Sequence, residues 1–306
     1  MRLLVTGAGG QLGREVVDLC TAAGDEVVSC DHATLDVADR DQVLQVFGAA
    51  VPDAVIHAGA WTNVDGCETH PDQAYAVNAL GTRHVAEGAR MVGARVCYVS
   101  TDYVFDGTLD RPYREWDAVN PVSVYGRSKL AGEDVLGPDD TVVRTSWVCG
   151  RHGRNFVKTI LDRAAEGQTL TVVDDQHGCP TFAEDLAGML RQLVVGRIPG
   201  LFHVTNQGPT TWFRLAHDAV EAGGLDQALV TPITTAEMQP PRPAPRPANS
   251  VLDNAALRLS GIPLLSDHHE PLERLVKELM SSGPCLPLPG PLGPRFPLPG
   301  PLGPPA

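Results

Sequence analysis

Tyr125 and Lys129 are two residues whose types and spacing point to chemistry. They lie four positions apart in the run YGRSK, and on a helix this spacing places both side chains on one face. A lysine ammonium beside a phenol stabilises the phenolate and lowers the tyrosine pKa, so the tyrosine can exchange protons near neutral pH. Tyrosines number only 5 in 306 residues, which makes a chance pairing uncommon. The structural alternative is a partly buried tyrosine beside an exposed lysine.

A glycine-rich turn near the N-terminus is suited to hold a dinucleotide. Between a predicted strand and a predicted helix the chain reads GAGGQLG, with glycines at Gly7, Gly10 and Gly13. These glycines allow a tight turn, a close approach to a pyrophosphate and close packing of the helix, which Gln11 and Leu12 open. The alternative is a purely structural turn, but its place between the first strand and a helix favours the nucleotide.

Two aspartates compete for the adenosine ribose of such a nucleotide. Asp31 ends the second predicted strand, about 18 residues beyond the glycine turn, and Asp36 lies close by. A carboxylate there accepts hydrogen bonds from the ribose hydroxyls and repels a 2′-phosphate, which favours NADH over NADPH. A solvated loop aspartate is the alternative.

A third group follows the fourth predicted strand, where the chain reads VSTDYVFDG from residue 99. In an open parallel sheet the carboxyl ends of the strands face the ligand crevice. The hydroxyl of Thr101 or of Ser100 can therefore hydrogen-bond a reacting oxygen. Alternatively, both hydroxyls only cap the end of the strand.

These groups require a sheet that presents its strand ends to one crevice. Short β-branched runs at 3–5, 27–28, 54–57, 96–99 and 142–144 alternate with helical patterns at 11–23, 39–49, 72–92 and 125–136. The second half is less regular, with helices predicted near 155–165, 183–194 and 212–222 and strands at 170–173 and 201–204. Apolar strands joined by helices are typical of a parallel sheet covered on both faces. The sequence therefore predicts an α/β fold with a Rossmann-type doubly wound parallel sheet.

Composition narrows the class of protein. The net charge of −13 argues against a nucleic-acid partner, and no apolar run is long enough for a membrane helix. The 7 cysteines are scattered without a Cys-x-x-Cys pair, so we expect neither a disulfide framework nor a zinc site, and a cytoplasmic setting. Prolines at 240–247 predict an extended segment, and residues 281–306 form a Pro/Gly-rich tail predicted to be disordered.

Taken together, the glycine turn, the run from Ser100 to Gly107, the Tyr–Lys pair and the run RTSWV from Arg144 resemble the extended short-chain dehydrogenase/reductases. Within that family the chain is most similar to the dTDP-4-dehydrorhamnose reductases, from about residue 1 to 279. The resemblance implies that NADPH or NADH reduces the 4-keto group of a dTDP-linked 4-keto-6-deoxyhexose, which would complete dTDP-L-rhamnose. Tyr125 would donate the proton, Lys129 would hold the nicotinamide ribose, and Thr101 would bond the sugar oxygen.

The resemblance also implies further contacts. Asp102 and Trp147 match substrate-binding positions, and Asn155 is a weaker candidate for the substrate diphosphate. The positions that match cofactor contacts are Gly10, Gln11, Leu12, Asp31, Asp36, Ala60, Trp61 and Thr62. Some members of the family bind magnesium between subunits, for which carboxylates such as Glu68, Glu184 and Glu270 are candidates, although solvated surface carboxylates are the favoured interpretation. A homodimer is a further expectation. The chain departs from the pattern at Cys149, Trp61 and His177, which affects the shape of the sugar pocket more than the reaction type.

The resemblance suggests how the chain divides. Residues 1–148 would bind NAD(P), together with a returning strand and helix near 182–205, and residues 149–280 would bind the substrate. Two alternatives remain open. One is a nucleotide-sugar 4-epimerase or dehydratase of the same fold, although Tyr103 stands where dehydratases usually have a glutamate. The other is a non-catalytic regulatory subunit similar to that of methionine adenosyltransferase.

Overall fold

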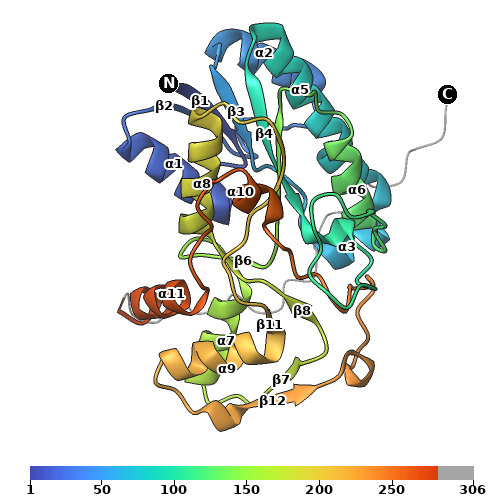
Figure 1. Cartoon of the computed structure of the whole chain (residues 1–306), viewed down its shortest axis with the longest axis vertical. Coiled ribbons are helices and arrows are strands. Elements are labelled where there is room, and N and C mark those ends of the chain that lie inside the picture. The colour runs from blue at the N-terminus through green and yellow to red at the C-terminus, as the bar shows by residue number, and fades with distance from the viewer. Residues whose placement is uncertain (282–306) are drawn as a thin grey trace, which may run out of the picture.

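The computed structural model describes residues 1–281, and its centre is a parallel sheet of six strands (Figure 1). The strands are β1 (Arg2–Thr6), β2 (Glu26–Cys30), β3 (Ala54–His57), β4 (Arg95–Thr101), β5 (Thr141–Thr145) and β10 (Gly200–His203). They lie in the order β10-β5-β4-β3-β1-β2. The predicted Rossmann-type fold is confirmed. Because the strand order reverses between β1 and β3, the ligand crevice is expected at the carboxyl ends of these strands.

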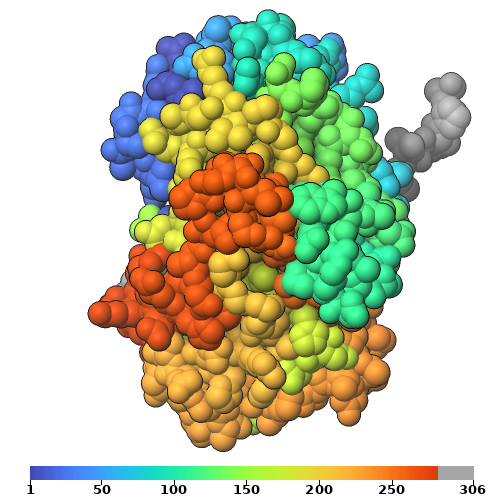
Figure 2. Space-filling view, in the orientation of Figure 1, coloured from blue at the N-terminus to red at the C-terminus, as the bar shows by residue number. Residues whose placement is uncertain are grey.

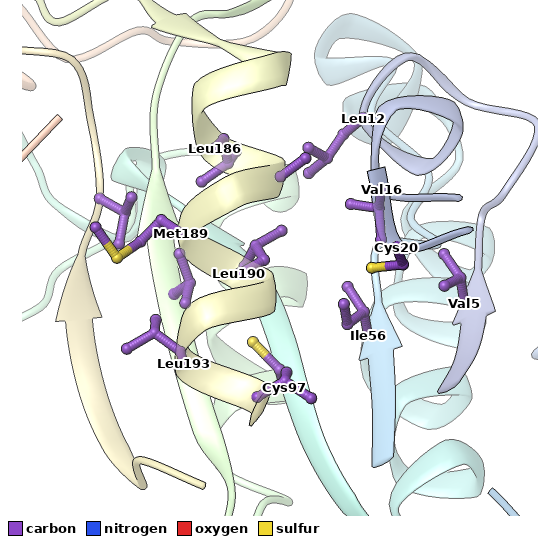
Figure 3. Packing of buried hydrophobic residues seen from close by; sticks show 14 of the residues in the cluster. Val5, Leu12, Val16, Cys20, Ile56, Cys97, Leu186, Met189, Leu190 and Leu193 are labelled. Carbon is purple, nitrogen blue, oxygen red and sulfur yellow. The ribbon is translucent and has the colours of Figure 1, made fainter. Parts of the chain in front are cut away.

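Helices cover both faces of the sheet (Figure 1). Helices α1 (Gln11–Ala22) and α8 (Ala183–Val195) pack on one face, and α2 (Arg40–Ala50), α5 (Gly81–Val92) and α6 (Val124–Glu133) lie on the other. Successive strand residues alternate between the two cores: Leu3 and Ile56 join the first cluster, whereas Leu4 and Val55 join the second. Figure 3 shows Ile56 with Leu190 between the strands and the two helices of the first face.

The helix predicted over 72–92 is interrupted. It consists of α4 (Pro71–Tyr75), a π-helical turn (Ala76–Leu80) and α5, and it is preceded by α3 (Val64–Thr69), which was not predicted. Within the π-helical turn, the Asn78 side chain bonds the main chain of Trp61 at 2.8 Å and 3.2 Å and the Ser128 hydroxyl at 3.0 Å. Long-range contacts of this kind stabilise a widened turn that local sequence does not specify.

The second half adds a smaller body beneath the carboxyl ends of the strands (Figure 1). Its helices are α7 (Phe156–Ala165), α9 (Trp212–Ala222) and α11 (His269–Ser281), of which α9 packs against the other two. Three short strand pairs complete it: β7 (Leu170–Val173) with β12 (Val230–Ile233), β6 (Val148–Cys149) with β9 (Thr181–Phe182), and β8 (His177–Gly178) with β11 (Thr210–Thr211). The sequence predicted neither β12 nor α11.

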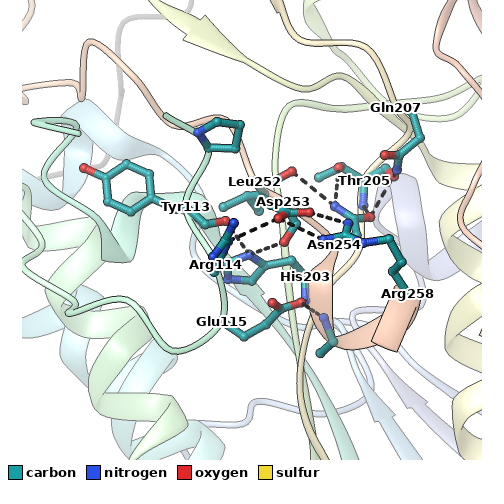
Figure 4. Close-up of polar contacts among 12 residues, drawn as sticks. Tyr113, Arg114, Glu115, His203, Thr205, Gln207, Leu252, Asp253, Asn254 and Arg258 are labelled. Carbon is teal, nitrogen blue, oxygen red and sulfur yellow. Dashed lines mark hydrogen bonds and ion pairs between the residues drawn. The ribbon is translucent and has the colours of Figure 1, made fainter. Parts of the chain in front are cut away.

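The chain then returns to the edge of the large sheet through α10 (Ala255–Leu259). There the Glu115 carboxylate accepts hydrogen bonds from the main-chain N–H groups of His203 and Ala256, each at 3.0 Å (Figure 4). In the space-filling view this returning segment lies against the loop that follows β4 (Figure 2). The proline run at 240–247 contains no helix, as predicted. The predicted tail lies, from residue 282, outside the described residues.

Two findings on residues 1–281 bear on the setting. None of their helices combines the length and the apolar character needed to cross a bilayer. The six cysteines in this range are all buried and free.

Candidate active site

Helix α6 carries the predicted pair, and its start is fixed by Ser123, whose hydroxyl accepts a hydrogen bond from Gly126 N–H at 3.1 Å. Lys129 is only 2% exposed, so the alternative of a solvated lysine is wrong. Its Nζ donates to the Val99 carbonyl of β4 at 2.7 Å and lies 4.0 Å from the centre of the Tyr98 ring. Tyr125, one turn earlier, is partly buried.

Burial shifts the two titrating groups in opposite directions. It raises the pKa of the Tyr125 phenol, although a hydrogen bond with the Thr101 side chain opposes the rise. It lowers the pKa of Lys129 to about 7, with the carboxylate of Glu133 opposing that fall. The sequence argument expected a lowered tyrosine pKa, and this prediction is wrong for the chain without cofactor, because desolvation raises the pKa and the carboxylate of Asp102 adds to the rise. A phenol that keeps its proton is suited to donate it.

The end of β4 brings three polar side chains to Tyr125. The Thr101 hydroxyl donates to the Asp102 carboxylate at 3.0 Å and accepts from Tyr103 N–H at 3.2 Å, so it caps the strand end and also faces the phenol. Asp102 is 2% exposed, and burial raises its pKa to about 6. Its second carboxylate oxygen has no hydrogen-bond partner among the described residues. Tyr103 packs edge-on against Tyr125, with ring centres 5.6 Å apart. Ser100, the other predicted hydroxyl, instead donates to Glu133.

The glycine turn has the geometry that a bound pyrophosphate requires. Gly7 adopts φ +67°, and a Cβ on Gly13 would lie 2.1 Å from the Gly7 carbonyl oxygen, so larger residues are excluded. Gly10 precedes α1 without any side-chain cap, which leaves the first N–H groups of the helix available to an anion. Gln11 is used by the fold, since its Nε2 donates to the Val148 carbonyl at 2.9 Å. Leu12 packs in the core of the first face.

The structure separates the two competing aspartates. A Cβ added to Gly9 would lie 3.2 Å from the Asp31 Cβ, so Asp31 is adjacent to the glycine turn. Its carboxylate accepts hydrogen bonds from Thr34 and Ala33, which lower its pKa. Asp36 is exposed, and its carboxylate accepts from Ala38 N–H at 3.0 Å.

The segment after β3 links the predicted cofactor positions to the catalytic pair. Trp61 packs in one apolar cluster with Tyr125 around the buried Cys67. Ala60 is partly buried, and Thr62 is exposed. The main chain at this point therefore runs close to the pair.

The predicted substrate positions differ in how the fold uses them. Trp147 has φ 47° and stacks on Trp212, with ring centres 3.6 Å apart. Asn155 caps α7 through its carbonyl oxygen and donates to Gln11 at 2.7 Å, so its polar atoms already have partners, and this weakens it as a diphosphate ligand. Of the departures from the family pattern, Cys149 is buried and His177 is exposed.

Sequence reasoning missed a contact that spans much of the chain. Arg246, in the proline-rich segment, pairs with Asp65 of α3 at 3.0 Å and 3.1 Å. Burial raises the pKa of the Tyr103 phenol to about 12, and the Arg246 guanidinium opposes that rise. The stack of Trp212 on Trp147 was missed as well. No local spacing reveals such contacts, because the partners lie far apart in sequence.

Within a single chain, the described residues do not bring together the carboxylates considered for magnesium. Glu68 accepts a hydrogen bond from Val124 N–H at 2.7 Å, Glu184 pairs with Arg274 at 3.2 Å, and Glu270 is exposed. Within residues 1–281, none of the three carboxylates belongs to a group of potential metal ligands within 4.8 Å of one another.

A doubly wound sheet with a glycine-rich first turn and a buried Tyr–Lys pair beside the strand ends defines an oxidoreductase of the short-chain dehydrogenase/reductase type. The chain matches the family described as RmlD substrate binding domain over residues 1–281, and it belongs to that family.

Individual relatives agree with this assignment. The chain is 41% identical over 305 residues to a dTDP-4-dehydrorhamnose reductase of Streptomyces griseus, covering 95% of this chain and 97% of the relative. A dTDP-4-dehydrorhamnose reductase of Clostridium acetobutylicum has a similar structure, with TM-score 0.88, 40% identity and coverage of 92% and 100%. The Bacillus anthracis enzyme, solved in complex with NADP, has TM-score 0.87, 37% identity and coverage of 90% and 99%.

Proposed function

We propose that this protein reduces the 4-keto group of dTDP-4-dehydro-6-deoxy-L-mannose (dTDP-4-dehydrorhamnose) with NADH or NADPH, giving dTDP-L-rhamnose. The observation that carries the proposal is the Tyr125–Lys129 pair beside Thr101 at the end of β4. Relatives that are named for this activity, and that are about 40% identical to this chain over nearly its whole length, support the proposal.

Each active-site residue has its own role in the proposed reduction. A bound nicotinamide cofactor supplies the hydride that reduces carbon 4. The Thr101 hydroxyl turns from Asp102 to donate its hydrogen bond to the keto oxygen, and Tyr125 delivers a proton to the same oxygen as negative charge develops on it. Lys129 holds the nicotinamide ribose, and its ammonium stabilises the tyrosinate that the proton transfer leaves behind. Asp102 and Trp147 contact the sugar nucleotide.

We also propose the division of the chain given by the sequence. Residues 1–148 with the returning portion near 182–205 bind the dinucleotide through the glycine turn and Asp31. Residues 149–280 bind the sugar nucleotide. The packing of α8 against α1 supports the first part of this proposal.

The state of the protein in the cell is a further proposal. The acidic charge supports the absence of a nucleic-acid partner, and the six buried free thiols support a reducing, cytoplasmic setting. A homodimer is expected and is testable by light scattering.

The test is oxidation of NADH and of NADPH, followed by absorbance, with dTDP-4-dehydrorhamnose as substrate. Turnover should fall about 10²–10⁴-fold in Tyr125→Phe. Tyr75→Phe is the matched control: Tyr75 is partly exposed on α4, and its loss should leave activity within about twofold. Wild-type protein that folds but oxidises neither cofactor would contradict the proposal. The epimerase and the regulatory subunit would then be tested, the former by cofactor that stays bound through purification.

A further inference from the structure

Helix α6 presents a third side chain to the end of β4, one turn beyond the catalytic pair. Tyr125, Lys129 and Glu133 are spaced four residues apart, so they lie along one face of the helix. The first two contact the last residues of β4, as described above. Glu133 does the same, because the Ser100 hydroxyl donates a hydrogen bond to its carboxylate. One strand end therefore touches the helix at three successive turns.

A buried arginine ties the same carboxylate to the next strand. Arg144 of β5 is directly opposite Ser100 in the strand register. Its Nη2 lies 2.6 Å and its Nε 2.9 Å from the Glu133 carboxylate oxygens, and the two side chains are only 5% and 8% exposed. Ion pairs this deeply buried contribute little net stability, because desolvation of both charges offsets their attraction. Stabilisation of the fold therefore does not explain the pair, which points to another role.

The surroundings of Lys129 suggest that role. The titratable and charged groups around its ammonium are His57 of β3, Tyr98 of β4, Tyr125 one turn earlier on α6, and Glu133 with its partner Arg144. Burial lowers the pKa of His57 to about 3 and raises that of Tyr98, so both are neutral at pH 7. Glu133 is thus the carboxylate, among the described neighbours of Lys129, that favours its charged form.

We propose that Glu133 is a positioning residue for the reduction: anchored by Ser100 and Arg144, it sets the register of α6 against the sheet and favours the ammonium form of Lys129. This inference rests on the proposed roles of Tyr125 and Lys129. It concerns a residue that contacts neither substrate nor cofactor in the proposed reaction and acts through its neighbours.

The test is the pH dependence of kcat/KM in Glu133→Gln, which keeps the shape of the side chain but removes its charge. Without the carboxylate Lys129 loses its proton more easily, so the alkaline limb of the profile should move about one pH unit lower, with kcat reduced about tenfold or more. Glu133→Asp keeps the charge and should restore the position of the limb even where kcat stays low. The matched control is Glu87→Gln, which removes the carboxylate of an exposed arginine pair with Arg40 and should leave profile and kcat unchanged.

The outcomes separate this inference from the proposed function. An active wild type, an inactive Tyr125→Phe and a Glu133→Gln profile like that of the wild type would overturn only the role of Glu133. An equal fall of activity at every pH would also overturn it, since that indicates a structural role alone. If Glu133→Gln does not fold because Arg144 is left unpaired, the double variant Glu133→Gln/Arg144→Gln removes both buried charges. It should move the alkaline limb in the same direction but by less, because the positive charge of Arg144 is removed together with the carboxylate.

Discussion

At the scale of single residues, burial sets the charges of the catalytic pair before any ligand binds. The phenol of Tyr125 is held protonated, as a proton donor requires, whereas the ammonium of Lys129 is destabilised. Because the Lys129 pKa lies near 7, the folded chain gives up a proton that the unfolded chain keeps up to the ordinary lysine pKa of 10.5. This difference links the stability of the protein to pH.

The sign of that linkage gives a prediction. Where the unfolded state binds more protons, the free energy of unfolding rises with pH, here by at most about 1.4 kcal/mol per pH unit from Lys129. We expect this rise between about pH 7 and about pH 8.5 in denaturant titrations of the cofactor-free protein, and a smaller slope in Lys129→Met. The range stops below the ordinary thiol pKa of 9.0, where the raised pKa of buried Cys97 begins to act in the opposite direction. Equal slopes in both proteins would mean that Lys129 keeps its full charge in the fold.

Cofactor preference is a second prediction at this scale. Asp31 lies beside Gly9 in the glycine turn, so its carboxylate would repel a 2′-phosphate. Asp31→Ser should shift the ratio of kcat/KM for NADH over NADPH about tenfold toward NADPH, while serine can still cap the turn to Thr34. Asp36→Ser is the matched comparison, because Asp36 also accepts a main-chain hydrogen bond in the same loop. A larger shift in Asp36→Ser would mean that Asp36, and not Asp31, binds the adenosine ribose.

At the scale of elements, local pattern predicted the parts of the chain whose structure is decided locally. The strand at Ala54–His57 and the helix at Trp212–Ala222 have the predicted bounds, because continuous apolar residues or a helical stripe define them. The π-helical turn at Ala76–Leu80 was missed, since side-chain contacts to other elements stabilise it. The helix His269–Ser281 was not predicted although it is amphipathic, because Pro/Gly-rich sequence, which is typical of non-helical chain, follows it directly.

The candidate site divides in the same way. The Tyr–Lys pair and the glycine turn are each encoded within a few residues, so sequence alone identified them. The ion pair of Glu133 with Arg144, the stack of Trp147 on Trp212 and the approach of Arg246 depend on how distant elements pack. Their residue types were visible in the sequence, but their partners were not.

Helix α8 provides a prediction at the element scale, because it returns from the second half of the chain to cover the nucleotide-binding sheet. Leu190 is fully buried in the cluster that α8 shares with α1 (Figure 3). Leu190→Ala should lower the free energy of unfolding by about 2–5 kcal/mol in urea titrations. Val195→Ala, at the exposed end of the same helix, should change it by less than about 0.5 kcal/mol. A small effect in Leu190→Ala would mean that α8 docks only loosely on the sheet.

At the scale of the whole molecule, the proline-rich segment connects the second half of the chain to the active site. Prolines restrict the backbone without forming regular hydrogen bonds, so this segment is positioned mainly by contacts of its other residues with neighbouring elements. Asp65 of α3 accepts hydrogen bonds from Arg246 and Arg242 and from Ala244 N–H. The guanidinium of Arg246 acts on the Tyr103 phenol by opposing the rise of its pKa on burial, and the Tyr103 ring contacts Tyr125. The contacts of Asp65 with this segment are therefore linked to Tyr125 through Arg246 and Tyr103.

Weakening the hydrogen bonds between Asp65 and the proline-rich segment should therefore weaken substrate binding more than cofactor binding. Asp65→Asn removes the charge that attracts both arginines, and we expect KM for the sugar nucleotide to rise about threefold to tenfold, with KM for NADH unchanged. Steady-state kinetics with each substrate varied in turn measures both values. Glu26→Gln is the control, because it breaks an exposed carboxylate–arginine pair with Arg2 at the far end of β2 and should change neither KM. An equal rise of both KM values in Asp65→Asn would contradict this prediction. It would mean that the ion pair supports the fold in general, because no hydrogen bond described for the proline-rich segment involves the glycine turn proposed to bind the dinucleotide.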